Sequence, residues 1–129
     1  MQLNINDLNL TQLYLNQRKV NEVSLWLDID TIRSTKVTVI HYNDKYYIVD
    51  GHTRCYVAYI MGIAEVPIEI YDLDVNSVEM NLYIKCMKWC KQSDIKHISD
   101  LSTRIVTESS FNKLWINKCK TEMELIDGI

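Results

Sequence analysis

The chain has 129 residues, of which 47% are hydrophobic, and its formal net charge is −3. This length and apolar content suit one compact domain. The acidic balance argues against a surface built to neutralise many nucleic-acid phosphates, although it allows a local basic pocket, so we expect no duplex DNA as a ligand. No apolar run approaches the length of a membrane span, and the first residues lack the basic and apolar regions of a signal peptide, so we expect a cytoplasmic protein that does not bind membranes.

The first part of the chain predicts strands and one helix. A short strand at residues 3–5 precedes a helix over residues 16–27, in which apolar side chains repeat at helical spacing. Residues 37–42 are rich in β-branched side chains and predict a strand. A tight turn at residues 43–45 returns the chain into a partner strand at residues 46–49, so the pair is expected to form a hairpin.

A second helix is expected directly after this hairpin. It covers residues 52–61, and Gly62 suits the position that ends a helix. A strand at residues 66–71 follows. Strand, helix and strand with short connections indicate a right-handed crossover, if the two strands are parallel neighbours.

The remainder of the chain changes character. Residues 75–92 predict a long helix, residues 98–102 a short helical turn, and Thr107 suits the N-cap of a final amphipathic helix. We therefore predict an α/β (α+β) fold: a small mixed sheet with helices over residues 1–74, followed by a helical half over residues 75–129 that packs on the same domain.

The four cysteines, Cys55, Cys86, Cys90 and Cys119, include no C-x-x-C pair. Without a secretion signal, reduced thiols are the expected state. A zinc site needs about four ligands, which these positions supply only by coincidence of the fold. We therefore expect no metal site built from the cysteines.

The most informative segment is the turn that joins the hairpin to the second helix, Asp50-Gly51-His52-Thr53-Arg54. The N–H groups at a helix start lack helical partners, and the helix dipole favours an anion there. Arg54 and His52 are expected to add positive charge, and Thr53 adds a hydroxyl donor. The segment predicts a phosphate site, with His52 and Asp50 as candidate catalytic residues and Gly51, His52, Thr53 and Arg54 as candidate nucleotide-binding residues.

Each of these residues also has a structural interpretation. Arg54 could form an ion pair with Asp50, and His52 could be an ordinary first-turn residue. Asp50 either holds a magnesium ion or, as we favour, caps the helix by accepting a backbone N–H. Gly51 permits the turn or a close approach of ligand in either interpretation.

A resemblance to a known family rests on the same residues. The run Val49-Asp50-Gly51-His52-Thr53-Arg54, followed by Ala58-Tyr59, Gly62 and Val66-Pro67, resembles the ParB/sulfiredoxin superfamily, and within it the small bacterial ParB-like proteins with a D-G-H-T-R motif. The resemblance covers just over half of the chain. It implies a small α/β nucleotide-binding fold that holds phosphate at the start of the helix after the motif, with ATP or ADP as the nucleotide, with or without Mg²⁺.

The sequence also departs from the pattern of this superfamily. Sulfiredoxins carry a catalytic cysteine two places before the motif arginine, where this chain has His52, so sulfiredoxin chemistry is not expected. The related free-serine kinases use a glutamate from the N-terminal segment as base, whereas Leu10-Thr11-Gln12 offers no carboxylate. Glu22 or Asp28 could substitute only if the intervening helix brings one of them near. The last part of the chain shows no helix-turn-helix of the kind found in partition proteins.

Two functions therefore remain open. One is an enzyme for phosphoryl transfer or nucleotide hydrolysis that uses the Asp50–Arg54 turn, and a carboxylate near Arg54 would favour it. The other is a non-catalytic nucleotide-sensing or protein-interaction module, with a partner bound by the C-terminal helices. A nuclease would need a cluster of metal-binding carboxylates, for which Asp50 alone is too little.

Overall fold

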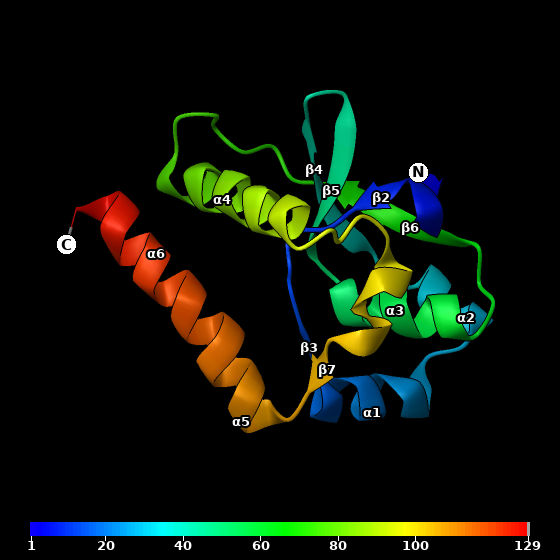
Figure 1. Ribbon diagram of the computed structural model, residues 1–129. Coiled ribbons are helices and arrows are strands. Elements are labelled where there is room, and N and C mark those ends of the chain that lie inside the picture. The colour runs from blue at the N-terminus through cyan, green and yellow to red at the C-terminus, as the bar shows by residue number, and fades with distance from the viewer. Residues whose placement is uncertain (129) are drawn as a thin grey trace.

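The computed structural model describes residues 1–128 and has a five-stranded mixed sheet at its centre (Figure 1). In spatial order the strands are β1 (Gln2–Asn4), β6 (Glu65–Ile70), β4 (Val37–Tyr42), β5 (Lys45–Asp50) and β2 (Leu8–Asn9). The pairs β1–β6 and β4–β5 are antiparallel, and β4–β6 and β2–β5 are parallel. The predicted mixed α/β fold is confirmed, and so is the helical character of the C-terminal part.

The hairpin of β4 and β5 forms where the sequence predicts it. Asn43 and Asp44 both have positive φ, 49° and 62°, which is the conformation of a two-residue type I′ turn. The turn fixes the pairing of Tyr42 with Lys45. The second strand runs on to Asp50, and the chain therefore enters the next helix at the end of a central strand.

The helix after the hairpin, α3 (His52–Ile60), also begins and ends as predicted. Gly62 has φ +80°, and the N–H of Ile63 donates to the carbonyl of Ala58 at 2.9 Å, a bond typical of glycine-terminated helices. The condition set for a right-handed crossover, that the strands on either side of α3 are parallel neighbours, is not met. Strand β4 lies between β5 and β6, and because it is antiparallel to β5 and parallel to β6, the strands on either side of α3 run in opposite directions.

Side-chain caps set the starts of the other long helices. Asn16 accepts from the N–H of Arg18 at the start of α1 (Gln17–Trp26), and Ser77 accepts from the N–H of Met80 at the start of α4 (Val78–Gln92). A short helix, α2 (Ile29–Arg33), follows α1. Both long helices agree with prediction, except that α4 begins at its serine cap rather than at residue 75.

Residues 107–128 form a C-terminal arm that runs beside α4 (Figure 1). The arm contains α5 (Glu108–Phe111), a π-helical segment (Asn112–Ile116) and α6 (Asn117–Asp127), and Thr107 caps its start as predicted. The π-helical segment was not predicted. A π turn inserts one residue into the helix and so changes which side chains face the protein after it.

The N-terminal and C-terminal parts are joined by a second, two-stranded sheet. Strand β3 (Leu15–Asn16) pairs in parallel with β7 (Ile105–Val106). Next to this pair, Arg104 donates from Nε to the carbonyl of Leu13 at 2.7 Å, and the N–H of Leu15 donates to the carbonyl of Arg104 at 3.0 Å. The helical part is therefore bonded through its backbone to the start of α1.

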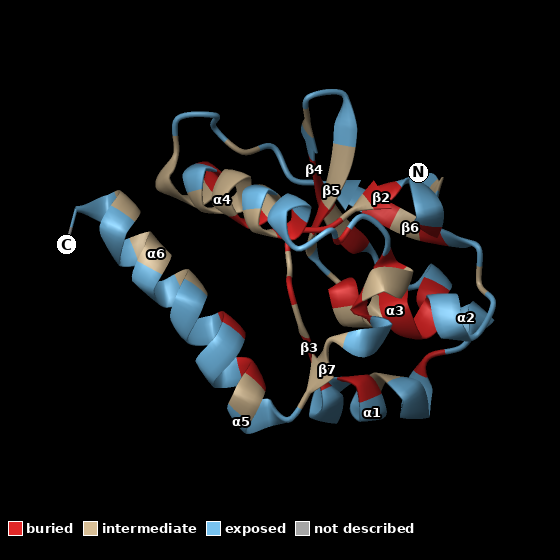
Figure 2. Cartoon of the chain, viewed as in Figure 1, coloured by how far each residue is buried: buried red, intermediate tan, exposed pale blue. Residues whose placement is uncertain are grey.

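One hydrophobic core spans both parts of the chain, and Figure 2 shows its buried residues gathered around the sheet and α3, whereas α6 is mostly exposed. Two 3₁₀ helices, Ile5–Asp7 and Ile98–Thr103, contribute to it. Its members from both parts include Ile5, Leu8, Val39, Ile48, Ala58, Cys86, Ile98 and Leu101. Within residues 1–128, none of the helices combines the length and the apolar character needed to cross a bilayer.

Candidate functional site

The start of α3 carries no side-chain cap. Gly51 is the N-cap residue, with φ +116°, and its carbonyl accepts the first helical bond at 2.9 Å. The preference for Asp50 as the cap is wrong, because Asp50 is still in strand β5 and its carboxylate turns toward Arg54. Within residues 1–128, the backbone N–H groups of His52, Thr53 and Arg54 therefore have no hydrogen-bond partner.

Only glycine fits position 51. A Cβ atom there would lie 3.1 Å from Nη2 of Arg54 and 3.2 Å from Cγ1 of Val37, and the backbone has a positive φ that L residues rarely adopt. Val37 is fully buried, so a side chain at position 51 would have to displace a core residue by a few tenths of an ångström. The glycine thus permits both the turn and the close approach of the arginine.

Arg54 is held against this turn by two partners. Its Nη1 donates to the carbonyl of Lys36 at 3.0 Å, and its Nη2 lies 3.3 Å from Oδ2 of Asp50. The arginine side chain is 17% exposed and the aspartate side chain 77%. The ion pair considered from the sequence is thus present. The guanidinium has five N–H donors, so some of them stay available to a ligand after these two contacts.

His52 is buried, and the positive charge expected from it is wrong at neutral pH. Its Nε2 accepts the backbone N–H of Thr11 at 3.0 Å, and burial lowers its pKa from 6.5 to about 3. A ring nitrogen that accepts an N–H carries no proton, so the proton of the neutral ring is on Nδ1. The side chain can offer an anion a neutral N–H donor, but at neutral pH it is a poor proton donor in acid–base chemistry.

The burial of His52 predicts a specific loss of stability in acid. In the unfolded chain the imidazole takes up a proton below pH 6.5, whereas in the folded chain it does so only near pH 3. Its contribution is therefore complete above pH 6.5 and is lost as the pH falls from 6.5 toward 3. We expect this residue to lower the free energy of unfolding by about 2 kcal/mol between pH 7 and pH 5, at about 1.4 kcal/mol per pH unit.

The measurement is urea denaturation of wild type and His52→Asn from pH 7 to pH 5. The asparagine variant should have a lower free energy of unfolding than wild type at every pH. It should also lack the part of the fall between pH 7 and pH 5 that the histidine causes. His41→Asn serves as control, because His41 is exposed on β4. Equal slopes in wild type and His52→Asn would show that His52 does not resist protonation.

A pocket of about 390 Å³ opens at the start of α3, between α1 and the C-terminal arm. We call it the α3 pocket. It brings together all five residues of the predicted site and unites them with residues far away in the sequence. Its lining consists of Gln12, Asn16, Lys19, Glu22, Val23, Trp26, Val49, Asp50, Gly51, His52, Thr53, Arg54, Phe111, Trp115 and Ile116.

A carboxylate from α1 reaches this pocket. Of the two carboxylates considered from the sequence, Glu22 lies in the lining, and its Oε1 accepts from Nε of Arg18 at 3.1 Å. Asp28 is not in the lining, because it caps α2 by accepting the N–H groups of Asp30 and Thr31. The helix thus brings one of the two side chains to the turn that carries Arg54.

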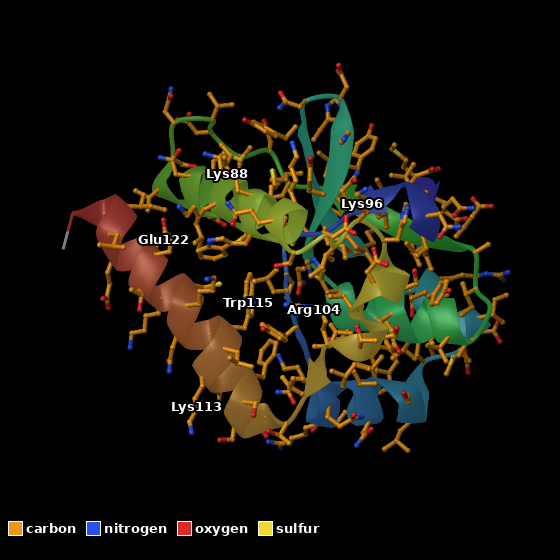
Figure 3. The ribbon with its side chains drawn as sticks, viewed as in Figure 1. Lys88, Lys96, Arg104, Lys113, Trp115 and Glu122 are labelled. Carbon is orange, nitrogen blue, oxygen red and sulfur yellow. The ribbon has the colours of Figure 1, made fainter. Side chains whose placement is uncertain are left out.

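Sequence reasoning missed the other walls of the α3 pocket. Lys19 and the partly exposed Trp26 come from α1, and Phe111 and Trp115 come from the C-terminal arm. Trp115, labelled in Figure 3, is buried and packs edge-on against Trp89 of α4, with ring centroids 6.0 Å apart. Local sequence patterns do not predict these walls, because the position of the walls depends on the pairing of β3 with β7 and on the π-helical segment.

A second basic hollow also lies in the described part of the chain. It has a volume of about 570 Å³, lies between the β4–β5 hairpin and α4, and its lining includes Lys45, Lys88, Lys91, Lys96 and His97. It lacks the uncapped helix start that distinguishes the α3 pocket. Among residues 1–128, no group of three or more His, Cys, Asp and Glu side chains is arranged to hold a metal ion.

No protein-family model and no curated protein matches the sequence. Among solved structures, the fold is similar to that of protein Atu1540 from Agrobacterium tumefaciens, with a TM-score of 0.53 and 19% sequence identity. The match covers 78% of this chain and 60% of the Atu1540 chain. At this identity the likeness concerns the fold alone.

Proposed function

We propose that this protein binds a nucleotide and holds one of its phosphates at the start of α3. The observation that carries the proposal is the uncapped helix start, with unpaired N–H groups at His52, Thr53 and Arg54 beside a pocket. Such donors, together with the positive end of the helix dipole, suit phosphate. The buried His52 ring adds a neutral donor, and Lys19 adds positive charge from the opposite wall.

The α3 pocket favours a nucleotide over a bare phosphate. Its volume lies in the usual range for small-molecule sites, and Trp26 offers an aromatic surface suited to a base. The resemblance to the ParB/sulfiredoxin superfamily makes ATP or ADP the first nucleotides to test, with and without Mg²⁺, for which Asp50 is the candidate ligand. The four cysteines are free thiols, which fits the reducing cytoplasm where these nucleotides occur.

Phosphoryl transfer or nucleotide hydrolysis is the reaction class that suits this pocket. Such chemistry depends mainly on positioning and charge neutralisation, which Arg54, Lys19 and the helix start would supply. Glu22 is the candidate base, because it is the carboxylate from α1 in the same lining. Its bond to Arg18 favours the alternative, a nucleotide-sensing module without catalysis, since Oε1 of the carboxylate is already occupied by Nε of Arg18.

Calorimetric titration with ATP, ADP, CTP and GTP, with and without Mg²⁺, tests the binding. We expect Lys19→Ala to weaken the binding of the preferred nucleotide by about 1.5–3 kcal/mol, the scale of a hydrogen bond to a charged group. Lys88→Ala is the matched control, since it removes the same charge from the second basic hollow. Loss of affinity in Lys88→Ala alone would place the nucleotide in that hollow, and no binding by wild type would contradict the proposal.

A second experiment separates the enzyme from the sensing module. Nucleotide turnover by wild type is compared with turnover by Glu22→Gln, with affinity measured in parallel. If the protein is an enzyme with Glu22 as base, the variant binds nucleotide and loses turnover. Binding without turnover in wild type, across candidate hydroxyl acceptors and water, would support the sensing module.

A further inference from the structure

The facing sides of α4 and α6 bring two cysteines together. Cys86 is buried on α4 and Cys119 is partly exposed on α6, and these two helices pack against each other. Both are free thiols. The pair thus joins a buried cysteine to a partly exposed one.

Two further contacts between the helices flank the cysteine pair and fix its register. Nζ of Lys85 lies 3.9 Å from Oε1 of Glu122, and Nζ of Lys118 lies 4.3 Å from the centre of the Trp89 ring. Each lysine directly precedes one of the two cysteines, and its partner on the other helix lies three positions after the other cysteine. Figure 3 shows Glu122 on the side of α6 that faces α4. The two cysteines therefore lie opposite each other in a packed interface between the helices.

We propose that Cys86 and Cys119 are a redox-active thiol pair that a hydroperoxide converts into a disulfide linking α4 to α6. The thiolate of Cys119 attacks the hydroperoxide, whose O–O bond breaks to give a sulfenic acid on Cys119 and an alcohol or water. The sulfur of Cys86 then attacks the sulfenic sulfur. The S–S bond forms, the S–O bond breaks, and water leaves with the proton of the Cys86 thiol.

The surroundings assign the two sulfurs different roles. The neighbouring Cys86 thiol and the nearby Lys118 ammonium lower the pKa of Cys119, whereas the neighbouring Cys119 and burial raise the pKa of Cys86. A lowered pKa and exposure mark the thiol that oxidants attack first, and a neighbouring thiol resolves the product. Cys119 is therefore the attacking sulfur and Cys86 the resolving one.

The other two cysteines are poor candidates for oxidation. Burial raises the pKa of Cys55 and of Cys90 to about 12. Cys55 is fully enclosed on α3, and Sγ of Cys90 points to the carbonyl of Gln12 at 3.8 Å. They serve as internal controls in the same molecule.

The test oxidises the whole chain with hydrogen peroxide, alkylates the remaining thiols in denaturant, and maps the peptides without reduction. We expect loss of alkylation at Cys86 and Cys119, a peptide pair linked through them, and full alkylation of Cys55 and Cys90. Thiol reductant should restore all four. In Cys86→Ser, the sulfenic acid on Cys119 should persist and react with dimedone, whereas Cys90→Ser should behave as wild type.

Several results would overturn the proposal. A link between Cys86 and Cys90, a dimer joined through Cys119, or full alkylation of Cys119 after peroxide would each do so. The mapping of wild type decides the matter by itself, so a variant that folds poorly does not leave the proposal untested.

Discussion

Replacement of Trp115 by alanine should lower the free energy of unfolding by about 3–5 kcal/mol, the range for loss of a buried aromatic side chain. Trp115 is 6% exposed and contacts Trp89 of α4 edge-on, so it is one of the residues through which the C-terminal arm packs on the rest of the protein. Because Trp115 also lines the α3 pocket, the variant should lose nucleotide affinity as well. Urea denaturation and calorimetric titration measure the two effects.

The neighbouring residue provides the control. Leu114 is 44% exposed and does not line the α3 pocket. Leu114→Ala should therefore change the free energy of unfolding by only about 0.5–1 kcal/mol, in keeping with a residue that keeps much of its surface in water. Equal losses in the two variants would mean that the arm does not pack through Trp115.

Gly51→Ala is the second substitution with a large expected effect, a loss of about 2–6 kcal/mol in the free energy of unfolding. Backbone strain at φ +116° contributes about 1–3 kcal/mol. Forcing Arg54 and Val37 away from the new methyl group adds about 1–3 kcal/mol. Denaturant unfolding, followed by circular dichroism, measures the sum.

Gly62→Ala separates the two contributions. Gly62 also has a positive φ, +80°, but a Cβ atom there meets nothing within 4 Å. Its substitution should cost only the strain of the left-handed conformation, about 1–2 kcal/mol. If Gly51→Ala and Gly62→Ala lowered the free energy of unfolding equally, the proximity of Arg54 and Val37 to position 51 would not contribute to the loss of stability.

The parts of the fold that local chemistry determines could be predicted from the sequence. Asn43 and Asp44 tolerate the positive φ of the hairpin turn, Thr107 caps the arm, and Gly62 ends α3. Each of these depends on a few adjacent residues. The order of the strands depends on contacts between distant segments, and in the structure β4, not β5, lies beside β6.

Only the part of the candidate site that lies at the end of β5 and the start of α3 could be predicted from the sequence. The Asp50–Arg54 turn lies where the sequence indicates it, but the environment of each side chain depends on segments far away. His52 is neutral because Thr11 and the surrounding core enclose it. Glu22 reaches the pocket because α1 packs beside α3. Such contacts are tertiary, and no local pattern reports them.

The pairing of β3 with β7 has a consequence for how the chain acquires its structure during synthesis. Leu13 and Arg104 are 91 positions apart, so the bond between them must wait until most of the chain has left the ribosome. Until then the nascent N-terminal segment exposes Leu13 and Leu15, which are buried in the finished protein. Contacts this distant in sequence slow folding and leave apolar surface open to chaperones and to aggregation. Termination of translation before residue 104 should therefore yield fragments that are degraded or aggregate.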